Sequence, residues 1–237
     1  MRIPPKGWAA DGLTEFLETA RQNQFATFAN FEDQMLDLKT VDDITRRSLE
    51  GRRDPNPLLP AIFLLRAHSS LRSAAGLVMA GQLYDANSIF RNCLEACGYA
   101  IFIGTDAARG ERWVRRHDSI ETRKAVRSEF TAKAVDAAIS AGSEKLGDIY
   151  RKLYEDAIDY GAHPNERGFT LNMIIERKPN ERKISQVYLS SDSRHISFLL
   201  QRTIQIGIFI IRAIDLLFPT FINDEDRTKL ANLVVRY

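Results

Sequence analysis

Apolar residues recur at helical spacing through most of the chain. In residues 11–39 they fall three or four positions apart, and Asp11 precedes the first of them as an N-cap. This spacing predicts one long helix from Asp11 to about Lys39. A short helical piece then ends near Gly51, and the prolines that follow predict a loop leading into the first turn of the next helix.

Two strongly apolar helices come next. Residues 59–80 predict one helix, with Gly81 marking its end. Residues 84–103 predict another that is apolar on most sides, so we expect it to be deeply buried before it ends at Gly104. From Thr105 the sequence becomes polar and basic, and Thr105 with Asp106 marks a new helix start.

The hydrophobic period changes after two shorter predicted helices, which occupy residues 132–141 and 143–160. FTLNMIIE and most of KISQVYLS alternate apolar and polar positions, which predicts strands over residues 169–176 and 183–189 joined by the turn RKPNER. Because an isolated hairpin is marginally stable in water, we expect this one to lean on the helices. A long apolar helix then runs to Phe218, where Pro219 stops it, and a last helix follows.

These patterns together predict an all-α fold. We expect a bundle of about six or seven helices with one small β-hairpin near residues 169–189. Residues 1–50 would form an N-terminal helical segment, and residues 55–237 the core with the inserted hairpin, the two making one compact domain.

Composition narrows the class of protein. The net charge of the 237 residues is only +2, which gives no overall attraction to nucleic acid or to a membrane. The most apolar stretch, residues 196–218, is interrupted by charges such as Arg202, Arg212 and Asp215, so we interpret it as a core helix and expect no membrane span. The first residues lack a signal-peptide pattern, and the two cysteines, Cys93 and Cys97, fit a reduced, cytoplasmic protein.

One pair of charges lies inside the predicted buried helix. Arg91 and Glu95 are four residues apart, so their side chains meet on one helix face. Buried charges need partners, because desolvation costs several kcal/mol. The pair either fixes the packing of the helix as an internal ion pair, or it lines a polar pocket in which Arg91 binds an anion or Glu95 acts as a base.

A second group of polar residues lies in YGAHPNERG. Pro164 disfavours helical geometry at His163, and Asn165 tolerates a tight turn, so the motif ends the preceding helix. The imidazole, the amide and the nearby Asp159 and Tyr160 are also groups that bind ligands or transfer protons. The motif is therefore either a helix stop or one side of a site.

The sequence resembles an uncharacterised family of helical bacterial proteins. The resemblance rests on GQLYDANSIFRNCLEACGYAIFI with its R-x-x-x-E spacing, on ARGERWVRRHD, and on the later Tyr to His-Pro corner, and it covers about residues 59–218. It implies the helical fold and a meeting of Arg91, Glu95 and His163 in space. It implies no particular activity.

A second resemblance is to helical ribonucleases of the HEPN type, which carry an arginine and, four to six residues later, a histidine. RWVRRH supplies Arg112 and His117, although Trp113 stands where a polar residue is usual. This resemblance implies a metal-independent ribonuclease. The alternative is that the basic residues of this region form a solvated helix face, on which Trp113 is half-buried or stacks on a nucleic-acid base.

Other catalytic and metal-binding motifs are absent from the sequence. We find no Gly-rich phosphate loop, HExxH, GxSxG or CxxC, and we expect no metal and no cofactor. We interpret His68, beside Arg66 and Arg72, as a core or interface histidine. The leading hypothesis is a binding or interaction module for a small anion or a protein, as a monomer or a homodimer, with Arg91, Glu95, Asp159, Tyr160, His163 and Asn165 at its pocket. The ribonuclease and a purely structural bundle are the alternatives.

Overall fold

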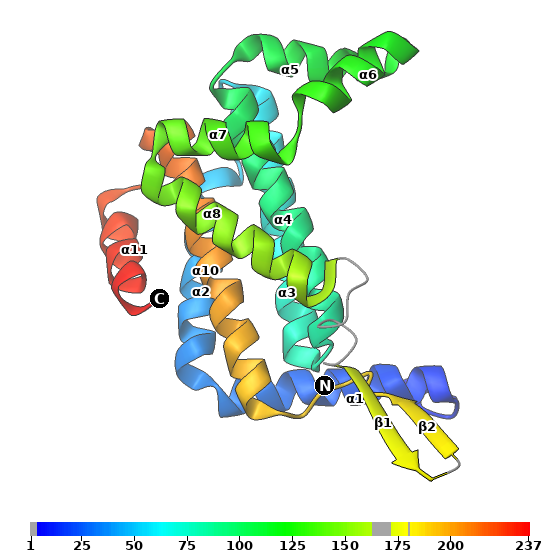
Figure 1. Cartoon of the computed structure of the whole chain (residues 1–237). Helices are drawn as coiled ribbons and strands as arrows, with labels where there is room; N and C mark the ends of the chain where they lie inside the picture. Colours follow the sequence, from blue (N-terminus) through cyan, green and yellow to red (C-terminus); the bar gives the residue numbers. More distant parts are fainter. Residues whose placement is uncertain (1–3, 163–171, 180) are drawn as a thin grey trace.

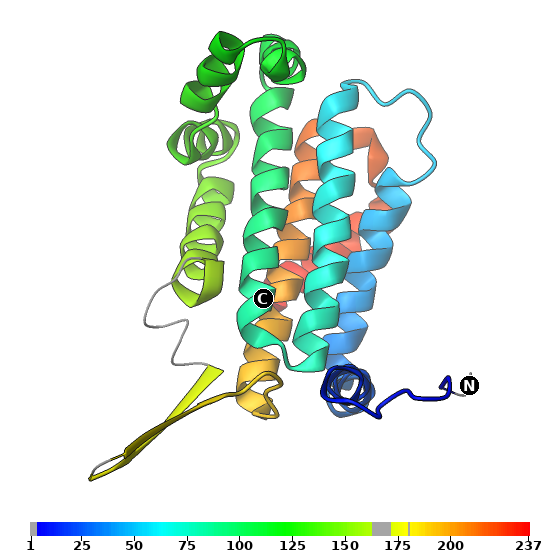
Figure 2. The same ribbon diagram turned by 90° about the vertical axis from the view of Figure 1, so that its right-hand side faces the viewer.

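The computed structural model describes residues 4–162, 172–179 and 181–237. Within them the fold is all-α with one small antiparallel hairpin, as the sequence predicted (Figure 1). Four long helices stand side by side and form the body of the bundle (Figure 2). They are α2 (Glu32–Leu49), α3 (Leu58–Ala80), α4 (Leu83–Gly104) and α10 (Ser193–Leu217).

Shorter elements surround this body. Helix α1 (Gly12–Asn30) crosses its base, while α7 (Ala132–Gly142) and α8 (Glu144–Ala157) lie against α4. The remaining elements are α5 (Ala107–Val114), η1 (Arg115–His117), α6 (Ile120–Glu129), η2 (Ile158–Ala162), β1 (Met173–Lys178), β2 (Glu181–Gln186), η3 (Pro219–Phe221) and α11 (Asp224–Arg236).

Local chemistry fixes many of the helix ends. Asp11, Asp106, Ser143 and Asp192 each precede a helix and accept hydrogen bonds from its first backbone N–H groups, which have no partner inside the helix. Gly81 ends α3 with φ of 86°, a left-handed conformation that costs glycine least. These boundaries confirm the predicted ones.

The predicted helix over residues 11–39 is wrong. Helix α1 ends at Asn30, Phe31 has the non-helical angles φ −123° and ψ 48°, and α2 begins at Glu32 and continues to Leu49. The break lets α1 turn across the base while α2 stands upright (Figure 2). The apolar spacing runs on across Phe31, because α1 and α2 both bury apolar side chains, and periodicity alone does not reveal the change in direction.

One buried core joins the long helices. Its largest fully buried side chains include Ile44 of α2, Leu64 of α3, Phe90 of α4 and Phe209 of α10. Helices α2 and α10 approach closely at Gly207, where an added Cβ would lie 2.1 Å from Val41 Cγ1. The predicted N-terminal segment thus shares the core of the bundle through α2.

Helix α10 is the one described helix that is long and apolar enough to cross a membrane. However, 67% of its most apolar window is buried among the other helices. This burial agrees with its interpretation as a core helix.

The hairpin pairs β1 with β2 in antiparallel register, with Ile175 opposite Ile184. Both strands overlap their predicted ranges and extend beyond them only towards the turn. Residues 169–171 of the first predicted strand lie outside the described residues. The expectation that the strands lean on the helices is wrong. Nearly all their described side chains are exposed, and the hairpin projects from the base of the bundle (Figures 1 and 2).

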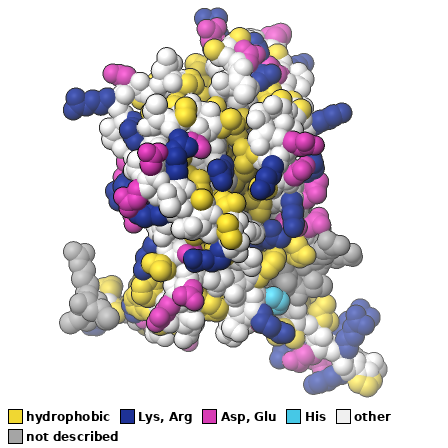
Figure 3. Space-filling view, turned by 90° about the vertical axis from the view of Figure 1, so that its left-hand side faces the viewer, with side chains coloured by type: hydrophobic (Ala, Val, Ile, Leu, Met, Phe, Trp, Pro, Cys, Tyr) yellow, Lys and Arg dark blue, Asp and Glu magenta, His cyan; other side chains and the backbone are white. Residues whose placement is uncertain are grey.

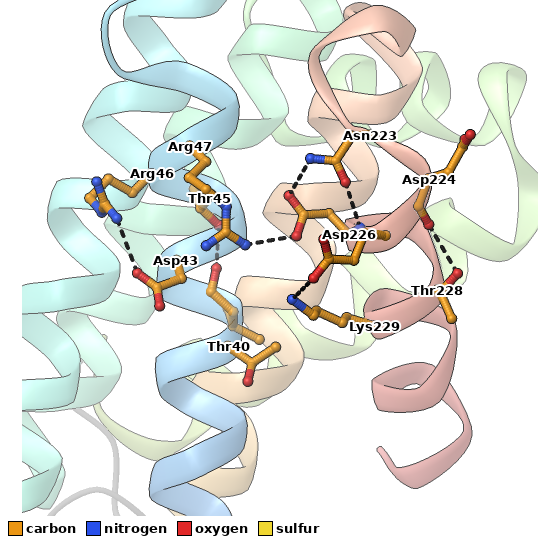
Figure 4. Close-up of polar contacts among 12 residues, drawn as sticks. Thr40, Asp43, Thr45, Arg46, Arg47, Asn223, Asp224, Asp226, Thr228 and Lys229 are labelled. Carbon is orange, nitrogen blue, oxygen red and sulfur yellow. Dashed lines mark hydrogen bonds and ion pairs between the residues drawn. The ribbon is translucent and has the colours of Figure 1, made fainter.

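Charged contacts attach the last helix to the body. Arg47 of α2 donates a 2.7 Å hydrogen bond to the buried carboxylate of Asp226 in α11, whose N-cap is Asn223 (Figure 4). Further along, the Tyr237 hydroxyl donates to buried Asp37 at 2.9 Å. On the face that Figure 3 shows, both signs of charge are interspersed around apolar strips.

Candidate functional site

Arg91 and Glu95 form the predicted pair on α4. Arg91 Nε donates to Glu95 Oε1 at 2.8 Å. The side chains are 28% and 36% exposed, so the pair lies at the edge of the bundle and is not buried in the core as the sequence predicted. The reason is that α8 covers only part of this side of α4, which the apolar composition of α4 does not reveal.

Tyr154 of α8 completes this cluster. Its hydroxyl donates to Glu95 Oε1 at 3.0 Å, and the Arg91 guanidinium lies 5.8 Å from the centre of its ring. Burial, together with the negative charge of Glu95, raises the pKa of Tyr154. The neighbouring ring of Tyr150 stacks on Tyr154 with centroids 5.6 Å apart. No pattern in the sequence pointed to Tyr154, because α4 and α8 are brought together only by tertiary packing.

The corner after α8 packs on the same helix. The Ser88 hydroxyl donates to the carbonyl of Gly161 at 3.0 Å, and an added Cβ on Gly161 would lie 2.6 Å from the carbonyl oxygen of Tyr84. Asp159 and Tyr160 belong to this corner, as part of η2. The start of the predicted motif therefore lies about one helical turn from Arg91. His163 and Asn165 lie outside the described residues.

Arg112 and His117 lie in the basic region at the far end of the bundle. The Arg112 guanidinium binds Glu129 through two hydrogen bonds, Nε to Oε2 at 2.8 Å and Nη2 to Oε1 at 2.6 Å. His117 is exposed in η1. Trp113 is half-buried among the rings of Phe63 and Phe130, so it packs in the bundle as one of the two interpretations predicted.

A groove of about 560 Å³ lies elsewhere, along the seam between α2 and α3 beside α1. We call it the Asp42 groove. Its floor is largely apolar, and charged side chains gather towards one end. The lining residues are Gln24, Met35, Leu38, Lys39, Asp42, Asp43, Leu71, Arg72, Ala75, Gly76 and Met79.

Three side chains meet at the charged end of this groove. Asp42 Oδ1 lies 2.7 Å from His68 Nε2 and accepts from Arg72 Nε at 2.6 Å, and Oδ2 accepts from Arg72 Nη2 at 2.9 Å. Burial raises the pKa of Asp42, but the hydrogen bonds from Arg72 and His68 outweigh it and hold that pKa below its usual value. Because an ionised carboxylate only accepts, His68 Nε2 carries the proton of their shared bond.

This network was missed in the sequence. His68 is 3% exposed, which confirms its interpretation as a core histidine, and Arg72 follows it by one turn on α3. Asp42 lies on another helix, 30 residues before Arg72. A signal existed only in the i, i+4 spacing of the histidine and arginine, and nothing in it pointed to Asp42.

No group of histidine, cysteine, aspartate or glutamate side chains in the described residues is arranged to hold a metal ion. Cys93 and Cys97 are free thiols buried in α4, and burial raises the pKa of both. Comparison with protein family models, curated proteins and solved structures finds no match to this chain.

Proposed function

We propose that the protein is a binding module whose site is the Asp42 groove, and that the ligand has an apolar body and one anionic group. The observation that carries this proposal is the division of the groove into an apolar floor and a charged end held by Asp42. Its volume falls in the range of about 300–1,000 Å³ typical of ligand sites, which are mostly apolar with a few fixed polar groups.

The charges at the polar end favour an anion. The charge of Asp42 is paired with Arg72, its Oδ1 also accepts from His68, and Asp43 pairs with Arg46 at 3.3 Å. A guanidinium has five N–H donors, and Asp42 engages only Nε and Nη2 of Arg72. Arg72 therefore keeps N–H donors for a ligand, and the bonds to Asp42 fix the orientation of its guanidinium. The Lys39 ammonium adds a second positive charge to the lining.

The dimensions suit an extended or helical apolar segment. On α2 the lining runs from Met35 to Asp43, and on α3 from Leu71 to Met79. At 1.5 Å per residue each wall is about 12 Å long, or roughly two helical turns. Methionines at the apolar end adapt to ligands of different shape, because their side chains are flexible and polarisable.

A pair of matched ligands tests the proposal. Dodecanoate and dodecanol share an apolar chain, but only dodecanoate carries a charge. Below micelle formation, binding to the native state raises the melting temperature. We expect a larger rise with dodecanoate for the wild type. The Arg72→Gln variant should lose this difference, while Lys133→Gln, an exposed charge change on α7, should keep it.

A groove-filling variant supplies the second arm. An added Cβ at Gly76 has no neighbour closer than Gln24 Nε2 at 3.8 Å, so the Cβ of Gly76→Leu has room and its larger side chain adds bulk to the groove lining. It should abolish the response to both ligands. Equal responses of wild type and Gly76→Leu would contradict the proposal. An amphipathic helical peptide with a terminal carboxylate, used in the same assay, distinguishes a protein partner from a small amphipathic acid.

A second candidate site is the Arg91 cluster, in which Arg91 would bind a small anion. The packing of Gly161 on Ser88 favours it, because this contact brings the polar corner towards Arg91. Inorganic phosphate, nucleotides and short RNAs, compared on wild type and Glu95→Gln, test this site separately from the groove. If the wild type cleaves the RNAs of this panel and Arg112→Ala abolishes the cleavage, the result favours the ribonuclease alternative instead.

A further inference from the structure

Large apolar side chains are exposed together at the base of the bundle. We call the exposed side of α1, together with the hairpin, the base surface. Its members are between 41% and 68% exposed. They are Leu13, Leu17, Phe25 and Phe28 of α1, Ile174, Ile175 and Ile184 of the strands, and Tyr188 after β2.

Helix α1 buries only part of its apolar side. Asn23 and Thr27 donate hydrogen bonds to the carbonyls of Ala80 and Met79, so this side packs on the end of α3. At about 100° per residue, Leu13, Leu17 and Phe28 occupy an adjacent arc of about 60°. Gln24 lies within that arc and donates to the Gly76 carbonyl of α3 at 3.0 Å, and the Lys39 ammonium lies 5.4 Å from the centre of the Phe28 ring. The apolar side chains of the arc nevertheless stay 41% to 67% exposed.

The hairpin extends the same surface. Tyr188, just after β2, contacts the ring of Phe16 in α1 with centroids 6.2 Å apart. Ile175 and Ile184 are directly opposite each other and 50% and 67% exposed. A two-stranded hairpin is marginal by itself, and its outer edges are open to another chain. The outer edges and the exposed isoleucines of the hairpin are therefore available to another chain.

The area is large enough for a stable interface. Side chains of this kind present roughly 150–250 Å² when fully open, so these half-exposed residues offer on the order of 800 Å². A typical stable interface buries about 800 Å² on each partner, whereas the largest apolar patch of a monomer is about 300–600 Å².

The charges of the base surface and the α1–α2 junction are self-complementary, which favours a second copy of this chain as the partner. The hairpin carries Arg177, Lys178, Arg182 and Lys183 against two glutamates, while Glu32 and Asp33 begin α2 at the junction with α1. Figure 1 places the hairpin and this junction at opposite ends of the base. When two bases meet about a twofold axis perpendicular to α1, each basic hairpin lies against the acidic junction of the other copy. A twofold interface requires such a self-complementary surface.

We propose that the protein forms a twofold homodimer through the base surface, with each hairpin packed along α1 and the α1–α2 junction of its partner. Sedimentation velocity and light scattering over a hundredfold range of concentration should give a species of twice 26.9 kDa. Leu17→Glu and Ile175→Glu should each raise the dimer dissociation constant at least a hundredfold. Ile120→Glu, at an exposed isoleucine of α6 at the far end, is the matched control and should not change it.

A charge exchange tests the predicted pairing of copies. Arg182→Glu should weaken the dimer about tenfold, and adding Asp33→Arg should restore it. Circular dichroism and melting temperature verify that the variants fold, since all these side chains are exposed. A wild type that is monomeric throughout would overturn the proposal. So would a dimer that Ile120→Glu disrupts and Leu17→Glu does not, or a monomer that binds anionic lipid vesicles through the base.

Discussion

Replacing Asp42 by asparagine tests whether the network at the charged end of the groove stabilises the fold. Asparagine has the same shape, but it has no charge, and one of its terminal atoms is an NH₂ donor where Asp42 accepts. A charge-assisted hydrogen bond contributes about 1.5–3 kcal/mol and a neutral one about 0.5–1.5 kcal/mol, so each retained bond loses about 1 kcal/mol. The structure determines how this loss divides between the two partners.

The buried partner should account for most of the effect. The His68 side chain is 4% exposed, whereas that of Arg72 is 49% exposed and its charge is screened by water. We therefore expect Asp42→Asn to lower the free energy of unfolding by about 1.5 kcal/mol and Asp42→Ala by about 3 kcal/mol, since alanine leaves a buried N–H of His68 without an acceptor. Arg72→Met should cost only about 0.5–1 kcal/mol.

Urea unfolding followed by circular dichroism measures these differences at neutral pH. The pKa of Asp42 is lower in the folded than in the unfolded protein, so its contribution is full above the unfolded value, near 4, and is lost as the pH falls through the folded value. The gap between wild type and Asp42→Asn should therefore narrow only in acid. A loss below about 0.5 kcal/mol for Asp42→Ala would contradict a stabilising role of the network. So would a loss for Arg72→Met as large as that for Asp42→Ala.

Three glycines should respond to alanine in different ways, each measured by the same unfolding assay. Gly81→Ala should destabilise by about 2–4 kcal/mol, because φ is 86° and the new Cβ would lie 2.4 Å from the carbonyl oxygen of Ser190; a loss below 1 kcal/mol would show that the chain relaxes there. Gly207→Ala should cost about 1–3 kcal/mol through overpacking against Val41, and an increase in stability would contradict the close approach of α10 and α2. Gly76→Ala should stabilise by about 0.5–1 kcal/mol, because the helix gains a better residue and the groove has room.

Sequence reasoning located part of the candidate chemistry. The i, i+4 spacing predicted the contact of Arg91 with Glu95 correctly, because neighbours on one helix meet whatever the tertiary structure. It predicted their burial wrongly, because the apolar character of α4 does not show how far α8 extends over it. Tyr154 and Asp42 were missed for a related reason: each meets its partners across a helix interface, and pairing between helices leaves no spacing in the sequence.

The sequence by itself determined the class of fold, most helix boundaries and the hairpin, since these depend on periodicity, capping residues and turn residues that act within a few positions. Only the tertiary structure decided that the chain breaks at Phe31, that the isoleucines of the hairpin face outward, and that Asp42 reaches His68 and Arg72 from another helix. The physical reason is that the hydrophobic effect rewards burial of an apolar face without specifying its partner. Packing of complete side chains selects which helices meet and which apolar faces stay uncovered.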